Sequence, residues 1–133
     1  MRNLVPDFLQ KQRRKDILRE LTAEVEKNLE ACYVMQQLGQ LRLFSLKAWE
    51  KARLSSGKHW SPEIQRYAEQ LEGYNSSLQQ ANDYEGWYAA DVGRQNQESA
   101  KILHERKEMA QENFRGLELV IKDARAALKN ILA

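Results

Sequence analysis

The chain has 133 residues, of which 42% are hydrophobic and 30% are charged, and its formal net charge is +2. This length allows one domain with a modest core, and a mean hydropathy of -0.75 favours an elongated shape over a compact globule. Residues typical of strands are few, and no stretch alternates with period two for long enough to form a sheet, so the composition predicts an all-α fold.

The first helix is predicted from about residue 6 to about residue 55. Pro6 and Asp7 suit its first turn. We expect the helix to continue through Gly39, at a cost of roughly 1 kcal/mol relative to alanine, because the neighbouring residues favour helix. From Leu38 to Leu54 the apolar residues spread beyond one face, so this segment is either the centre of a bundle or the place where a second subunit or protein docks. Because two or three helices would leave this face incompletely covered, we expect a homodimer. Before that segment, a stripe at three-four spacing comprises Ile17, Leu18, Leu21, Val25, Leu29, Cys32 and Met35.

A tight turn is predicted at residues 56–61. Gly57 can adopt the positive φ that ends a helix, Ser61 can cap the next helix with its hydroxyl, and Pro62 fits the first helical position. The chain is therefore expected to fold back, with a helix at about 62–83 antiparallel to the first. The apolar positions of this second helix recur every three or four residues and are Ile64, Tyr67, Ala68, Leu71, Tyr74, Leu78 and Ala81.

Residues 84–93 are the least helical part of the second half, with two glycines and several Asp and Asn residues. They predict a break into a second turn, and a weak helix through the same residues is the alternative. A last helix is predicted at about 94–132, because an apolar seam persists there over four heptads. The predicted architecture is a single domain over 1–133, an elongated antiparallel helical bundle or coiled-coil hairpin of two to three long helices.

Catalytic and metal-binding motifs are missing from the sequence. A di-iron bundle needs Glu-x-x-His pairs, but the residue three positions before His104 is Lys101, and His59 lies in the predicted turn. There is no Gly-x-Ser-x-Gly turn and no glycine-rich phosphate loop. We therefore expect no cofactor, no metal and no enzymatic activity.

Cys32 is the only cysteine, and its place in the apolar stripe predicts a buried thiol. An intrachain disulfide is impossible, so an oxidising compartment is not implied. The sequence also lacks a signal peptide and a run of apolar residues long enough to span a membrane, which predicts a cytoplasmic protein.

Aromatic residues are the most informative candidates for a contact surface. Tryptophan and tyrosine are favoured at the buried centres of protein interfaces. The alternative is that these rings fill space where helices end and pack together. The first interpretation predicts a non-enzymatic helical interaction module, a scaffold, adaptor or small chaperone, with Trp87 and Tyr88 as anchors. The candidate partner-binding residues are Trp49, Trp60, Tyr84, Trp87 and Tyr88.

A basic cluster near the start of the first helix supports a second hypothesis. Lys11, Arg13, Arg14 and Lys15 could contact phosphates of a nucleic acid or of an anionic membrane. Nearby acidic residues reduce the local charge, so a solvated helix surface is the favoured interpretation. Salt dependence would distinguish the two, because binding to polyanions weakens steeply as ionic strength rises.

Overall fold

In the computed structural model, which describes residues 7–56, 60–90 and 95–133, the chain is all-helical. The described parts contain no strand, as the composition predicts. None of the described helices combines the length and the apolar character needed to cross a membrane. The five helices are α1 (Asp7–Leu38), α2 (Lys47–Ser56), α3 (Pro62–Ala90), α4 (Gln97–Phe114) and α5 (Leu117–Leu132).

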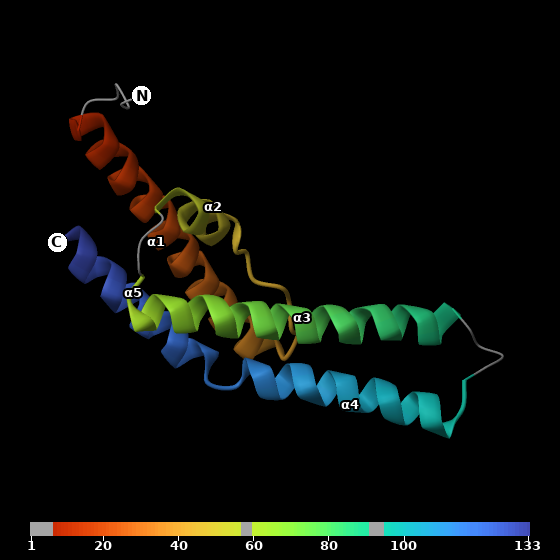
Figure 1. Cartoon of the computed structure of the whole chain (residues 1–133). Helices are drawn as coiled ribbons and strands as arrows, with labels where there is room; N and C mark the ends of the chain where they lie inside the picture. The colour runs from red at the N-terminus through yellow and green to blue at the C-terminus, as the bar shows by residue number, and fades with distance from the viewer. Residues whose placement is uncertain (1–6, 57–59, 91–94) are drawn as a thin grey trace, which may run out of the picture.

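The helices pack in two groups that share α5. α1 packs against α5 and α2, while α3 packs against both α5 and α4 (Figure 1). α1 and α5 run antiparallel, since Gln36 Nε2 donates to Glu118 Oε1 at 3.2 Å near one end and Arg125 pairs with Glu26 at 3.8 Å further along. α3 and α4 form an antiparallel hairpin, and the C-terminal part of α3 and the start of α4 extend away from the other helices (Figure 1).

The predicted single helix from about 6 to about 55 is wrong. α1 ends at Leu38, and Gly39 follows it with φ +66, a left-handed conformation that other residues adopt only with strain. Residues 40–46, which we call the strap, are not helical and lead to α2. Helix propensity is a weak preference that tertiary contacts can override, and the strap has such contacts on two sides.

On one side, α3 binds the backbone of the strap. The side-chain amide of Asn75 accepts a hydrogen bond from the Phe44 N–H at 2.9 Å and donates one to the Phe44 carbonyl at 3.0 Å. The hydroxyl of Tyr74 donates to the carbonyl of Arg42 at 2.8 Å. These bonds replace the helical partners that the strap gives up, as buried backbone groups require.

On the other side, α1 binds the end of the strap and the start of α2. Asn28 Nδ2 donates to the Ser45 carbonyl at 2.8 Å. The Glu24 carboxylate accepts hydrogen bonds from the backbone N–H groups of Ala48 at 2.9 Å and Trp49 at 3.0 Å. Glu24 thus serves as the N-cap of α2 from another helix, with its negative charge at the positive end of the α2 dipole.

The apolar residues spread from Leu38 to Leu54 are covered only in part by the rest of the chain. Phe44, Trp49 and Ala52 are all buried in the core, because the strap and α2 lie against the rest of the bundle. Leu38, Leu43 and Leu54, by contrast, are 63%, 48% and 79% exposed, so part of the apolar surface that suggested a homodimer stays uncovered. The oligomeric state itself stays a prediction.

α3 begins as predicted and ends later than predicted. Pro62 is its first residue, but the predicted cap by the Ser61 hydroxyl is wrong, because this hydroxyl has no hydrogen-bond partner among the described residues. The Ser61 carbonyl accepts the first helical hydrogen bonds, including one from the Ile64 N–H at 3.1 Å. The helix runs to Ala90, so the predicted break is absent from residues 84–90. Residues 57–59 of the predicted turn, which include Gly57, lie outside the described residues. Residues 91–93 of the predicted break also lie outside them. All seven apolar positions predicted for this helix are buried.

The predicted continuous helix at 94–132 is also wrong, because it divides at Gly116. Gly116 has φ +79 and separates α4 from α5. The start of α4 has a capping box in which Asn96 Oδ1 accepts from the Ser99 N–H at 2.9 Å and the Ser99 hydroxyl accepts from the Asn96 N–H at 3.0 Å. The division at Gly116 lets α4 follow α3 while α5 packs against α1.

Candidate interaction surface on the α3–α4 hairpin

The five aromatic candidates separate into two groups. Trp49 is only 5% exposed, and its ring packs against that of half-buried Trp60 with centroids 5.5 Å apart. This pair fills the space where α2 and the start of α3 meet. For these two rings the structure therefore agrees with the alternative interpretation, in which aromatic rings fill space where helices end and pack together. Trp49 therefore has almost no surface to offer a partner.

The other three aromatic residues lie in the last turns of α3. The rings of Tyr84 and Trp87 are 5.3 Å apart, and the guanidinium of Arg106 lies over the Tyr84 ring at 5.3 Å. Tyr84 and Tyr88 are half-buried, whereas Trp87 is 46% exposed. The Tyr88 carbonyl accepts a hydrogen bond from Gln95 Nε2 at 2.6 Å. The large apolar ring of Trp87 is thus partly exposed to solvent and partly packed against the Tyr84 ring.

Trp87 belongs to a surface formed by two parallel rows of side chains. Spacings of three and four residues place each row along one side of its helix. The rows meet where Asn113 Nδ2 donates to Ser77 Oγ and where Arg106 Nη1 donates to Gln80 Oε1 at 3.3 Å. We call this surface the hairpin face; it comprises Ser77, Gln80, Tyr84 and Trp87 of α3 and Ile102, Arg106, Met109 and Asn113 of α4.

The hairpin face is turned away from the strap. On the opposite side of the hairpin, Lys107 pairs with Glu85 at 3.0 Å. Both residues line a groove of about 310 Å³ whose other wall is the segment 39–41. None of the described helices lies over the hairpin face, and Trp87 and Met109 are 46% and 58% exposed there.

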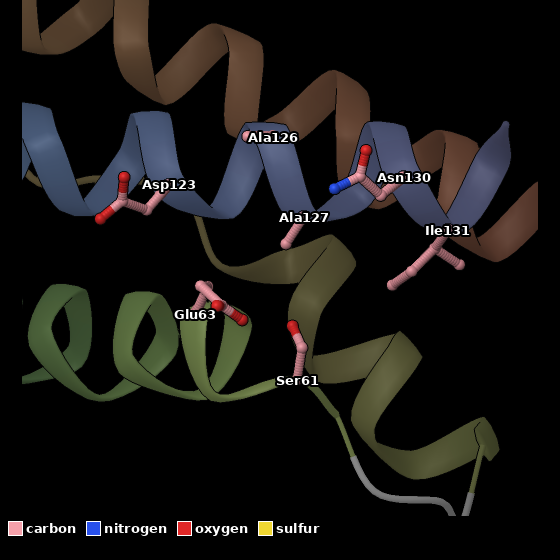
Figure 2. Close-up of a pocket in the computed structure, with 7 residues that line it drawn as sticks. All are labelled: Ser61, Glu63, Asp123, Ala126, Ala127, Asn130 and Ile131. Atoms are coloured by element: carbon pink, nitrogen blue, oxygen red, sulfur yellow. The ribbon is translucent and has the colours of Figure 1, made fainter.

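A second groove, of about 560 Å³, lies between the start of α3 and the C-terminal part of α5. Figure 2 shows Ser61 and Glu63 on one side and Ala127 and Ile131 on the other. Its remaining lining residues are Asp123, Ala126 and Asn130. Among the described residues the Ser61 hydroxyl is hydrogen-bonded to no carboxylate, so the described lining holds no nucleophile already paired with a base.

The remaining titratable and nucleophilic side chains that could serve in catalysis or metal binding lie apart from one another. His104 pairs with Glu108 at 2.9 Å on the exposed side of α4. Burial raises the pKa of the Cys32 thiol to about 11, which disfavours the reactive thiolate. Among the residues that the structure describes, no group of His, Cys, Asp and Glu side chains could hold a metal ion.

The basic cluster lies in the N-terminal part of α1. Lys11, Arg13, Arg14 and Lys15 are all exposed, and none forms an ion pair with another described residue. Phe8, which precedes them, is 68% exposed. The cluster is therefore accessible to a ligand, although the fold does not bring it near the hairpin face (Figure 1).

Sequence reasoning identified Tyr84 and Trp87 of the hairpin face and missed its other six residues, among them Arg106 and Met109. Their shared spacing with Ile102 and Asn113 was a signal, but its meaning depends on the α3 residues opposite. Only the fold brings the Arg106 guanidinium over the Tyr84 ring.

No protein-family model, curated protein or solved structure matches this chain. The functional proposal below accordingly rests on the geometry of the described residues.

Proposed function

We propose that this chain is a non-enzymatic helical interaction module, a scaffold, adaptor or small chaperone, that binds a protein partner through the hairpin face. The sequence predicts an antiparallel arrangement of helices. In this proposal, the antiparallel pair that presents the binding surface is the α3–α4 hairpin. The buried free thiol of Cys32 suits a reducing compartment, so the proposal places the protein in the cytoplasm.

The observation that carries the proposal is the exposure of Trp87 on a well-supported surface. Its ring stacks near Tyr84, which lies beneath the Arg106 guanidinium, so little side-chain freedom remains to be lost on binding. Met109 adds a second exposed apolar side chain on the same face. Tryptophan is among the residues most enriched in binding hot spots.

Affinity capture from an extract of the native host tests the proposal. Wild-type protein is compared with the Trp87→Ala/Met109→Ala variant and with Leu119→Ala, a matched control that removes an exposed apolar side chain from α5. We expect wild type and the control to recover one stoichiometric partner protein, and the double variant to lose it while keeping its helix content. Recovery of the same partner by the double variant, or of no partner by wild type, would contradict the proposal.

Self-association is part of the function predicted from the sequence and needs its own measurement. The apolar segment that suggested a homodimer is buried at Phe44, Trp49 and Ala52 but exposed at Leu38, Leu43 and Leu54, so a dimer would use this remaining surface or another one. Light scattering at tens of micromolar decides between the two states. A monomer at that concentration would remove self-association from the proposal.

Binding of a polyanion by the basic cluster is the alternative function. Four accessible cations without described ion pairs, next to exposed Phe8, favour it. Titration with anionic vesicles and with nucleic acid at two salt concentrations tests it, because phosphate contacts release counterions. Affinity that is unchanged by salt, or by replacing the four cations with glutamine, would exclude this alternative.

A further inference from the structure

Arg106 is the only charged side chain of the hairpin face. It forms no ion pair with a described carboxylate, and its hydrogen bond to Gln80 is long, at 3.3 Å. Its Nε is buried and has no acceptor among the residues that the structure describes. A half-buried guanidinium in this condition has lost hydration without gaining a counterion, and a carboxylate is the group that best supplies one.

The antiparallel pairing of α3 and α4 makes one more helix a suitable occupant of the hairpin face. Two antiparallel helices leave a shallow depression along their seam, and a third helix packed there completes a three-helix arrangement. The α3 row runs from Ser77 to Trp87, which is about 15 Å at 1.5 Å per residue. A partner helix of about three turns would therefore cover the face, with apolar residues on Trp87 and Met109.

Resting on the proposed function, we propose that the partner segment is an amphipathic helix with an acidic residue, Asp or Glu, that pairs with Arg106. The apolar side of this helix covers Trp87 and Met109, and its carboxylate approaches the guanidinium between them. The Tyr84 ring holds the guanidinium from below, so the charge is positioned before the partner arrives. Arg106 thereby selects acidic over basic helices.

Selection from a displayed library of three-turn helical peptides with randomised exposed positions tests this inference. Peptides that bind wild type are kept only if they fail to bind Trp87→Ala, which restricts the set to the hairpin face. The same selection is made on Arg106→Glu and on Arg66→Glu, a control with the same charge change at an exposed position near the start of α3. Helix content is compared for all variants, and Arg106→Gln replaces Arg106→Glu if the latter has lost helix.

We expect wild type and Arg66→Glu to enrich acidic over basic residues about fivefold to tenfold, the ratio given by a preference of about 1 to 1.4 kcal/mol. Arg106→Glu should reverse this preference, and Arg106→Gln should abolish it. Peptides that depend on Trp87 but show no acidic preference would overturn the acidic partner and leave the interaction module standing. If no recovered peptide depends on Trp87, the hairpin face is not a binding surface and both proposals fail.

Discussion

Replacing Asn75 with alanine tests how the strap is held. The change removes two hydrogen bonds to the Phe44 peptide group, at 2.9 and 3.0 Å. At about 1 kcal/mol each, their loss lowers the free energy of unfolding by about 2 kcal/mol. Alanine also has a better helix propensity than asparagine, and at any helical position this difference offsets the loss of stability by about 0.7 kcal/mol or less.

The exposed Asn82 of α3 supplies the matched control, since Asn82→Ala gains the same propensity and its side chain makes no hydrogen bond with a described residue. Denaturant unfolding of both variants, followed by circular dichroism, should therefore differ by about 2 kcal/mol, with Asn75→Ala the less stable. Equal stability of the two variants would refute the argument that these bonds replace helix in the strap. A loss of helix content in native Asn75→Ala, confined to about one helix, would localise the effect to α2.

Three further predictions concern the backbone and the buried titratable groups. Gly86→Ala, inside α3 with no atom near the added methyl group, should stabilise the protein by about 0.5 to 1 kcal/mol, whereas Gly39→Ala at φ +66 should destabilise it by about 1 to 2 kcal/mol in the same unfolding assay. Cys32 should react with an aromatic disulfide reagent at pH 8 only as fast as the protein unfolds, since burial raises its pKa to about 11; immediate labelling would contradict its burial. Burial also raises the pKa of Tyr74 to about 12 and raises that of Tyr67. As the pH rises, the unfolded chain therefore loses the protons of Cys32 and these tyrosines before the folded chain does. The free energy of unfolding should be constant below the ordinary pKa values of 9.0 for cysteine and 10.0 for tyrosine, and should fall as the pH rises above them. Unfolding measured from neutral to alkaline pH checks this sign, and a flat profile would be inconsistent with it.

The helical class and much of the core could be predicted from the sequence because they depend on local patterns. The three-four spacing from Ile64 to Ala81 identified seven positions that are all buried in α3. In α1, the stripe from Leu21 to Met35 is buried as well. A helix face that packs against others needs only apolar residues at these spacings, so one sequence suffices to find it.

The strap could not be predicted because its conformation depends on residues distant in the chain. Residues 40–46 favour helix, and the amide that holds Phe44 belongs to Asn75. Gly39 was a weak signal, since glycine within a helical pattern is often tolerated. The division of the last helix at Gly116 could not be predicted for the same reason.

The candidate surface was predictable only in part. The sequence singled out Tyr84, Trp87 and Tyr88 as possible anchors, and Trp87 is the most exposed of them. It also singled out Trp49, whose burial follows from the fold-back of the strap and α2. Arg106 acquires its place from a contact across the hairpin, which no local pattern encodes.

Site-specific photo-crosslinking in the native host tests the central claim most directly. A photoreactive amino acid is placed at Met109 on the hairpin face or at Gln79, an exposed α3 position outside it. The account predicts that the probe at Met109 crosslinks to one partner protein, that the probe at Gln79 does not, and that Trp87→Ala removes the crosslink. No crosslink at Met109, or the same crosslink from both positions, would contradict the assignment of the hairpin face as the binding surface.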